Sequence, residues 1–166
     1  MKRALPNLMS FPRIALGVAV LSSAALAAPT LTVSILNISS VTKDGVKAEV
    51  LTPTTTVHPG EVLMQRAVLK TDKALVNGRV TLPLSANTRY LPGSASVIPG
   101  TVLDFSADGG KTFSLKPLKT VTVTENGKTV EKTVPVPEAE YNALRWTITL
   151  APPGSETVVS YRYQVN

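Results

Sequence analysis

Cysteine is absent from the 166 residues of this chain, and histidine occurs only once. Without cysteine there is no disulfide framework, no thiolate metal ligand, no cysteine nucleophile and no lipid-modified cysteine after a leader. A single histidine also excludes a metal site built on a histidine pair. The chain must therefore bury a core of its own, and its length is sufficient for one domain.

A sustained helical period is missing after the first 28 residues, and aromatic residues make up only 5% of the chain. A nucleic-acid-binding protein should carry a basic stripe with interleaved aromatic residues, and neither is present. The formal net charge is +6, but three bases and no acid lie in the first 13 residues, so the rest carries +3. We expect a mildly basic surface and no nucleic-acid partner.

The first 27 residues have the parts of a secretory signal peptide. A basic stretch precedes a short apolar run, and Ala25 and Ala27 form the small-residue cleavage motif. We expect a signal helix that is removed before Ala28, since cleavage one residue later would put Pro29 directly after the scissile bond. The apolar run is shorter than the ~20 residues of a spanning helix, so a retained membrane anchor is the lesser alternative. The mature chain is predicted to be secreted, periplasmic or at the cell surface, with no transmembrane span.

Apolar and polar residues alternate along most of the remaining chain. This period of two is typical of strands with one buried face, and the segments are separated by Gly, Pro, Asn and Asp turn signals. The pattern predicts an all-β, antiparallel Ig-like β-sandwich of seven to nine strands, formed as a single domain by residues 28–166. The clearest alternation occurs in residues 46–50, 76–84, 144–150 and 159–165.

Several local features refine this prediction. Asn126-Gly127 predicts a type I′ hairpin, whereas Asn77-Gly78 is either a turn or a bulge inside a strand. Residues 137–142 are the one place where a single helical turn is indicated. Four aromatic residues on apolar strand faces are expected in the core rather than on a binding platform: Phe105, Trp146, Tyr161 and Tyr163.

One short segment, "SADGGKTF", resembles the Asp-box hairpin of sialidases and other propeller proteins. A sialidase needs several such boxes on separate blades, and a propeller needs about four or more blades, which this chain is too short to form. We therefore interpret the segment as a structural turn without catalytic function. Its residues are Ser106, Asp108, Gly109, Gly110 and Thr112.

Other candidate sites are weak. Asp104 and Asp108 could supply oxygen ligands to a weak calcium site, but further acids at alternate positions are missing, so a turn is favoured at Asp108. His58 is the only side chain of a type that ordinarily changes its charge near neutral pH. It precedes a Pro-Gly turn signal, so we expect it to lie in an exposed loop. Glu138 and Glu140 lie in a polar connection and are not expected to act as a hydrolytic pair. We predict no catalytic residue, no metal and no cofactor.

Three segments resemble the conserved-repeat domain of bacterial surface proteins, known as domain of unknown function 11. They are "TVHPGEVLMQRAVLKTD", "VTLPLSANTRYLPGSAS" and "LRWTITLAPPGSETVVSYRYQV", which occur in the family's order. The family's Asn-Thr-Gly is replaced here by residues 71–73, and the Asp before its Leu-Pro is replaced by Leu82, so the resemblance is to a divergent single copy. It implies an Ig-like sandwich in an exported envelope protein and no catalytic residues.

The function expected from these features is a non-catalytic structural or interaction module of the cell envelope that binds a protein partner. A small secreted hydrolase or inhibitor using His58, and a carbohydrate-binding sandwich, remain alternatives. The contact surface is predicted in residues 102–134, either as loops or as an edge hairpin. Its lysines, which would also protect an exposed edge, are Lys111, Lys116, Lys119, Lys128 and Lys132.

Overall fold

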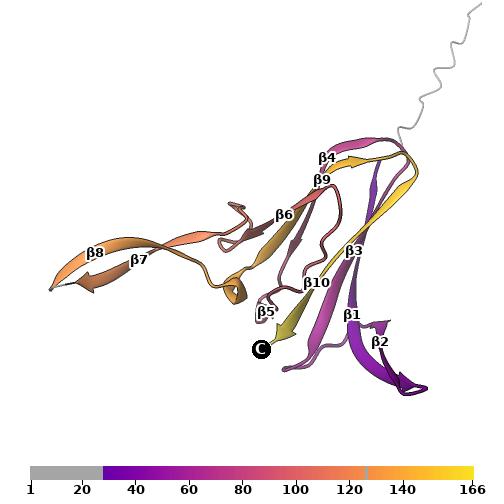
Figure 1. Cartoon of the computed structure of the whole chain (residues 1–166), viewed down its shortest axis with the longest axis horizontal. Helices are drawn as coiled ribbons and strands as arrows, with labels where there is room; N and C mark the ends of the chain where they lie inside the picture. Colours follow the sequence, from indigo (N-terminus) through magenta and orange to yellow (C-terminus); the bar gives the residue numbers. More distant parts are fainter. Residues whose placement is uncertain (1–27, 126) are drawn as a thin grey trace, which may run out of the picture.

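The computed structural model describes residues 28–125 and 127–166 (Figure 1). The expected signal helix, with Ala25 and Ala27, lies outside these residues, and so does Asn126 of the expected type I′ turn. All strands in the described residues pair antiparallel, which confirms the predicted fold class. These residues form β1 Thr30–Lys43, β2 Val46–Pro53, β3 Val62–Thr71, β4 Leu75–Pro83, β5 Thr88–Tyr90, β6 Thr101–Ser106, β7 Leu118–Glu125, β8 Lys128–Pro135, the 3-10 turn η1 Glu138–Glu140, β9 Ala143–Ala151 and β10 Ser155–Val165.

The ten strands of the described residues exceed the seven to nine expected. One reason is β5, which spans only three residues and pairs with the end of β10. A period of two cannot be recognised over so short a segment. The predicted helical turn is confirmed as η1.

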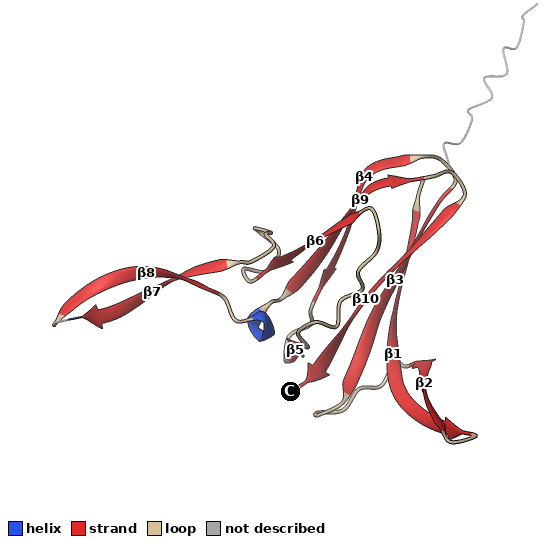
Figure 2. Cartoon of the chain, in the orientation of Figure 1, coloured by secondary structure: helices blue, strands red, loops and turns tan. Residues whose placement is uncertain are grey.

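The strands form two packed sheets and a separate two-stranded sheet (Figure 2). The first sheet has the order β2-β1-β3-β10-β5, and the second has the order β4-β9-β6. Their facing residues form one buried cluster, so the two sheets are the layers of a sandwich. The third sheet consists of β7 and β8 and extends away from these layers (Figure 1).

The core follows the alternation of the sequence. Trp146 and Tyr161 are fully buried and Tyr163 is nearly so, while Phe105 is half-buried against the same cluster. These aromatic residues therefore lie in the core, as predicted. The Tyr161 hydroxyl donates to the Pro83 carbonyl at 3.0 Å and also contacts the Gln65 side chain, so it joins β10 and β3 to the opposite sheet.

The order of strands is a variant of the immunoglobulin arrangement. If β1, β3, β4, β5, β6, β9 and β10 are lettered A to G, the sheets read A-B-G-D and C-F-E, whereas an immunoglobulin constant domain has A-B-E-D and C-F-G. The strands β6 and β10 have thus exchanged sheets. The connection of residues 152–154 makes this possible, since it carries the chain from β9 in one layer to β10 in the other.

Asn77 and Gly78 lie inside β4 rather than in a turn between strands. Asn77 has a positive φ of 53°, which Asn tolerates better than most residues. Val76 still lies opposite Leu150, and Gly78 lies opposite Ile148, so the register with β9 is kept. The positive φ of Asn77 is therefore accommodated inside β4 without an extra residue.

Candidate functional site

The most distinctive surface is the arm, which we define as β7 and β8 together. Among the described strands, β7 and β8 pair only with each other, from Leu118 opposite Pro135 to Glu125 opposite Lys128. Figure 1 shows the arm extending well beyond the two packed sheets. A two-stranded hairpin alone is only marginally stable in water, so a hairpin that packs on no other sheet is unusual in a small domain.

The two faces of the arm differ in chemistry. Residues directly opposite each other share a face, and successive residues alternate between faces. The valine face therefore carries Val121, Val123, Val130 and Val134 together with Lys119, Lys128, Lys132 and Glu125. The threonine face carries Thr120, Thr122, Thr124, Thr129 and Thr133, all of them exposed, together with Glu131.

The predicted contact lysines do not form one cluster. Lys119, Lys128 and Lys132 lie on the valine face, but Lys111 belongs to the Asp-box-like turn and Lys116 to the loop before β7. Lys119 pairs with Glu140 at 2.6 Å, and Lys132 pairs with Glu125. Within residues 28–125 and 127–166, no ion pair involves Lys111, Lys116 or Lys128.

The base of the arm is anchored to the sandwich. Val136 follows β8 directly and is buried in the core, and its N–H donates to the Pro117 carbonyl at 2.9 Å. A pocket of about 250 Å³ lies beside this anchor, lined in part by Phe105, Phe113, Leu118 and Glu140. The first residues of the arm are thus held, while the remainder extends into solvent.

The Asp-box-like turn is a closed hydrogen-bond network. The Asp108 carboxylate accepts bonds from the backbone N–H of Lys111 and of Thr112 at 3.0 Å each, and from the Thr112 hydroxyl at 2.6 Å. The buried Ser106 hydroxyl donates to Asp108 at 2.7 Å and accepts from the Gly110 N–H at 2.9 Å. The bonds from Thr112, followed by that from Ser106, hold the pKa of Asp108 well below its usual range.

Glycine is required at two positions of this turn. Gly109 and Gly110 have φ angles of 77° and 84°, which other residues rarely adopt. The Gly109 N–H donates to the Asn142 side chain at 2.9 Å, so the turn is also fastened to the segment before β9. The polar groups of the turn are hydrogen-bonded to one another and to Asn142, which agrees with the interpretation of the motif as a structural turn.

Asp104 and Asp108 do not converge on a common point for a cation. Asp104 accepts a bond from Arg145 at 3.0 Å, and the Arg145 guanidinium lies 4.2 Å from the centre of the Phe113 ring. Asp108 binds the turn instead. The part of the chain that the structure describes holds no cluster of three or more His, Cys, Asp or Glu residues with the arrangement of a metal site.

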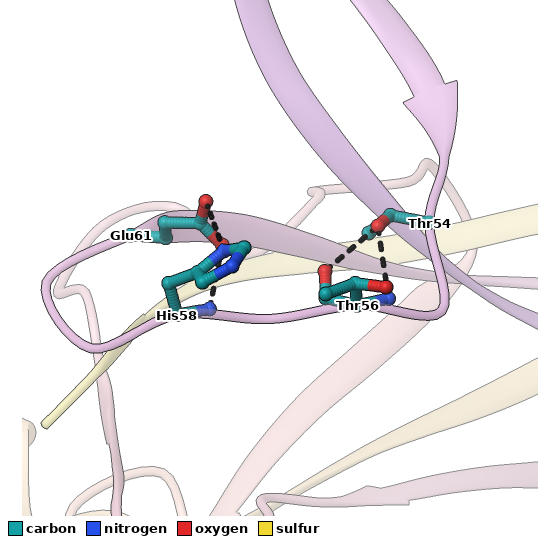
Figure 3. Close-up of polar contacts among 4 residues, drawn as sticks. All are labelled: Thr54, Thr56, His58 and Glu61. Carbon is teal, nitrogen blue, oxygen red and sulfur yellow. Dashed lines mark hydrogen bonds and ion pairs between the residues drawn. The ribbon is translucent and has the colours of Figure 1, made fainter.

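His58 lies in an exposed loop, as expected (Figure 3). Its Nδ1 lies 3.1 Å from one carboxylate oxygen of Glu61, and its backbone N–H donates to the other at 2.9 Å. The backbone bond and the ring contact lower the pKa of Glu61. Nearby, the Thr54 hydroxyl donates to the Thr56 carbonyl and accepts its N–H, which closes a small turn beside His58. Among the described residues, the ring of His58 bonds only to Glu61, so no serine nucleophile is placed beside it.

Sequence reasoning missed the separation of the valine and threonine faces. The signal was present in "KTVTVTE" and "KTVEKTV", where valine alternates with threonine or charge on both sides of one turn. Only the structure shows that the valine face is not covered by another sheet, since alternation alone does not say what packs on a strand.

No family model, curated protein or solved structure matches this chain. No helix in residues 28–125 or 127–166 has the length and apolar character needed to cross a membrane.

Proposed function

We propose that this chain is a non-catalytic interaction module of the cell envelope, exported by its signal peptide, that binds protein partners through the arm. The observation that carries the proposal is the isolation of β7 and β8 from the rest of the fold. A hairpin that packs on no sheet of its own domain has both outer edges and one apolar face available to another protein.

The body of the molecule supports this proposal in a second way. The sandwich has a large aromatic core, and it has internal polar contacts at the Asp-box-like turn and at the Arg145–Asp104 pair. The His58–Glu61 pair is exposed and is not joined by a nucleophile in the described residues. Such a body is well suited to hold an arm in a fixed position.

The resemblance to the conserved-repeat domain of bacterial surface proteins agrees with this role. That resemblance implies an exported sandwich that acts as a spacer or adhesive module, and it implies no active site. The proposed location is therefore the cell envelope or its exterior.

An arm deletion tests the proposal. Replacing residues 120–133 with Asn-Gly joins the opposed, hydrogen-bonded residues Lys119 and Val134 by a two-residue turn and keeps the Val136 anchor. Crosslinking and mass spectrometry in intact host cells should then show loss of the proteins captured by the unaltered chain, while cooperative unfolding is retained.

A matched control removes a different hairpin tip. Replacing residues 42–47 with Asn-Gly shortens β1 and β2 beyond the opposed, hydrogen-bonded residues Val41 and Ala48 and leaves the arm intact. This control should keep the captured proteins. Capture that survives the arm deletion, or that is lost equally in both variants, would contradict the proposal.

A further inference from the structure

The outer edge of β7 presents unpaired backbone groups in a defined pattern. In an antiparallel pair, only alternate residues of a strand bond to the neighbouring strand. The bond from the Val136 N–H to the Pro117 carbonyl fixes that alternation, so odd-numbered residues of β7 bond to β8. Thr120, Thr122 and Thr124 therefore turn their N–H and C=O groups to the free edge.

We propose that two copies of this chain dimerise by antiparallel pairing of β7 with β7 about a two-fold axis at Thr122. The arms would then form one sheet of four strands in the order β8-β7-β7-β8. The proposal names one partner of the arm, a second copy, and so rests on the proposed function.

The sequence of β7 is complementary to itself in this register. Residues on opposite strands of a two-fold pair have numbers that sum to twice the number at the axis. With Thr122 at the axis, Val121 faces Val123 of the second copy, and Thr120 faces Thr124. Lys119 faces Glu125 of the second copy at both ends. Paired valines, paired threonines and opposite charges are each favourable across antiparallel strands, by ~0.2–1 kcal/mol a pair.

Neighbouring registers lose this match. An axis at Val121 places Lys119 opposite Val123, and an axis at Val123 places Glu125 opposite Val121. Both put a charge against an apolar residue. The register at Thr122 is therefore selected by charge as well as by side-chain shape.

The outer edge of β8 has the opposite character. A two-fold axis at Val130 places Lys128 opposite Lys132, an axis at Glu131 pairs Glu with Glu, and an axis at Lys132 pairs Lys with Lys. Like charges directly opposite are destabilising, and charged residues commonly protect exposed edges from pairing. β8 is thus guarded against self-pairing in these three registers, whereas β7 has a complementary register at Thr122.

Formation of the dimer gives the arm the additional strands that it lacks as a monomer. Three or more strands with an apolar face are needed for a stable sheet, and the dimer supplies four. The valines of both copies would form one continuous face. Because the pairing is antiparallel and the arm extends from the body, the two sandwiches lie at opposite ends of the new sheet (Figure 1).

Existing ion pairs do not oppose this arrangement. Lys119 pairs with Glu140, and Glu125 pairs with Lys132, within one copy. Both pairs are about half-exposed, and such pairs contribute only ~0–1 kcal/mol. Lys119 and Glu125 can therefore face each other across the new interface while remaining near their present partners.

Proline substitution tests which edge is used. Analytical ultracentrifugation of the purified chain over a range of concentrations should show a monomer that converts to twice the monomer mass. Thr122→Pro removes an N–H from the β7 edge without breaking a bond to β8, and it should leave the chain monomeric. Thr133→Pro makes the same change at the β8 edge and should dimerise like the unaltered chain.

Charge reversal tests the register. Lys119→Glu alone places two acids opposite each other, and Glu125→Lys alone places two lysines opposite each other. Each variant should dimerise about tenfold more weakly or worse, because both ends of the pairing become repulsive. An equal mixture of the two variants should form a dimer of one copy of each, since both charge pairs are then complementary.

The results separate this inference from the proposed function. A chain that stays monomeric at all concentrations, or a mixture that fails to associate, overturns the dimer. Equal loss of dimer in Thr122→Pro and Thr133→Pro overturns the choice of edge. Capture of other envelope proteins by the arm in a monomeric chain would leave the proposed function standing without the dimer.

Discussion

At the scale of single residues, the Asp-box-like turn is stabilised by hydrogen bonds of its polar side chains rather than by apolar packing alone. Ser106 is fully buried and its hydroxyl serves both Asp108 and the backbone of Gly110. A buried polar group left without a partner costs ~1–3 kcal/mol. The turn is therefore a stabilising element, and its rigidity fixes the loop that leads to the arm.

Ser106→Ala should lower the free energy of unfolding by about 1–3 kcal/mol, because the Gly110 N–H and the Asp108 carboxylate each lose a partner. Urea denaturation followed by circular dichroism measures the change. Ser114→Ala is the control, since Ser114 is exposed and bonds to Phe105 through its backbone alone in the described residues. Equal stability of the two variants would contradict the role given to Ser106.

The turn should also make stability depend on acid pH. The pKa of Asp108 is lowered in the folded chain below the ordinary value of 3.8, so its contribution is complete above that pH and is lost as the pH falls through the folded pKa. The difference in melting temperature between the unaltered chain and Asp108→Asn should therefore be largest near neutral pH and shrink below pH 3.8. Calorimetry at several pH values measures it, and a constant difference would refute the assignment.

At the scale of secondary-structure elements, the arm has a sequence typical of buried strands but does not pack against a second sheet. Its sequence has the β-branched alternation of a buried strand, but β7 and β8 pack on neither layer of the sandwich. A strand with free backbone groups and few charges readily pairs with another chain. Because charges guard the β8 edge and the β7 edge is complementary to itself, we expect the arm to pair with a second copy through the β7 edge.

Hydrogen exchange of single backbone amides should show which edge of the arm pairs. At low concentration, the amides of Thr120, Thr122 and Thr124 should exchange rapidly, since they face the free edge. At high concentration they should become protected, whereas the amides of Thr129 and Thr133 on the β8 edge should remain unprotected. Nuclear magnetic resonance at two protein concentrations gives this comparison, and protection of both edges would argue for non-specific stacking of arms.

At the scale of the whole molecule, a single buried hydroxyl group joins the two layers of the sandwich. The Tyr161 hydroxyl contacts Pro83 in one layer and Gln65 in the other. Burial raises the pKa of Tyr161, so the hydroxyl stays protonated and can donate. This tie holds the edge strand β4 against the larger sheet.

Tyr161→Phe should destabilise the whole sandwich by about 1–2 kcal/mol while keeping its unfolding cooperative, because the Pro83 carbonyl and the Gln65 side chain lose a common partner. Thermal unfolding monitored by Trp146 fluorescence reports the change. Tyr163→Phe is the matched control on the same strand, since no hydrogen bond of its hydroxyl is found in the described residues. A larger effect at Tyr163 would contradict the inter-sheet tie.

Processing is a further property of the whole chain. The sequence predicts a mature protein that begins at Ala28, because Ala25 and Ala27 satisfy the small subsites of a signal peptidase. Intact-mass measurement of the protein from its host should give the mass of residues 28–166. Ala27→Leu should block cleavage, and a mass that includes residues 1–27 in the unaltered protein would indicate a retained anchor.

The sequence alone was sufficient for the fold class and for local geometry. Alternation placed Trp146 and Tyr161 in the core, the Gly-rich motif at Ser106 predicted a closed turn, and residues 137–142 predicted η1, because these depend on neighbours close in the chain. The short strand β5 was missed, since three residues carry no readable period.

The tertiary structure decided which strands share a sheet and what covers each face. The exchange of β6 and β10 between layers depends on which layer the chain enters after the connection of residues 152–154, and many such connections fit one alternating pattern. For the same reason, the alternation of valine in β7 and β8 could not show that these strands form a sheet of their own outside the sandwich. Alternation records only that one face of a strand is apolar, and contacts between residues far apart in the chain determine what that face meets.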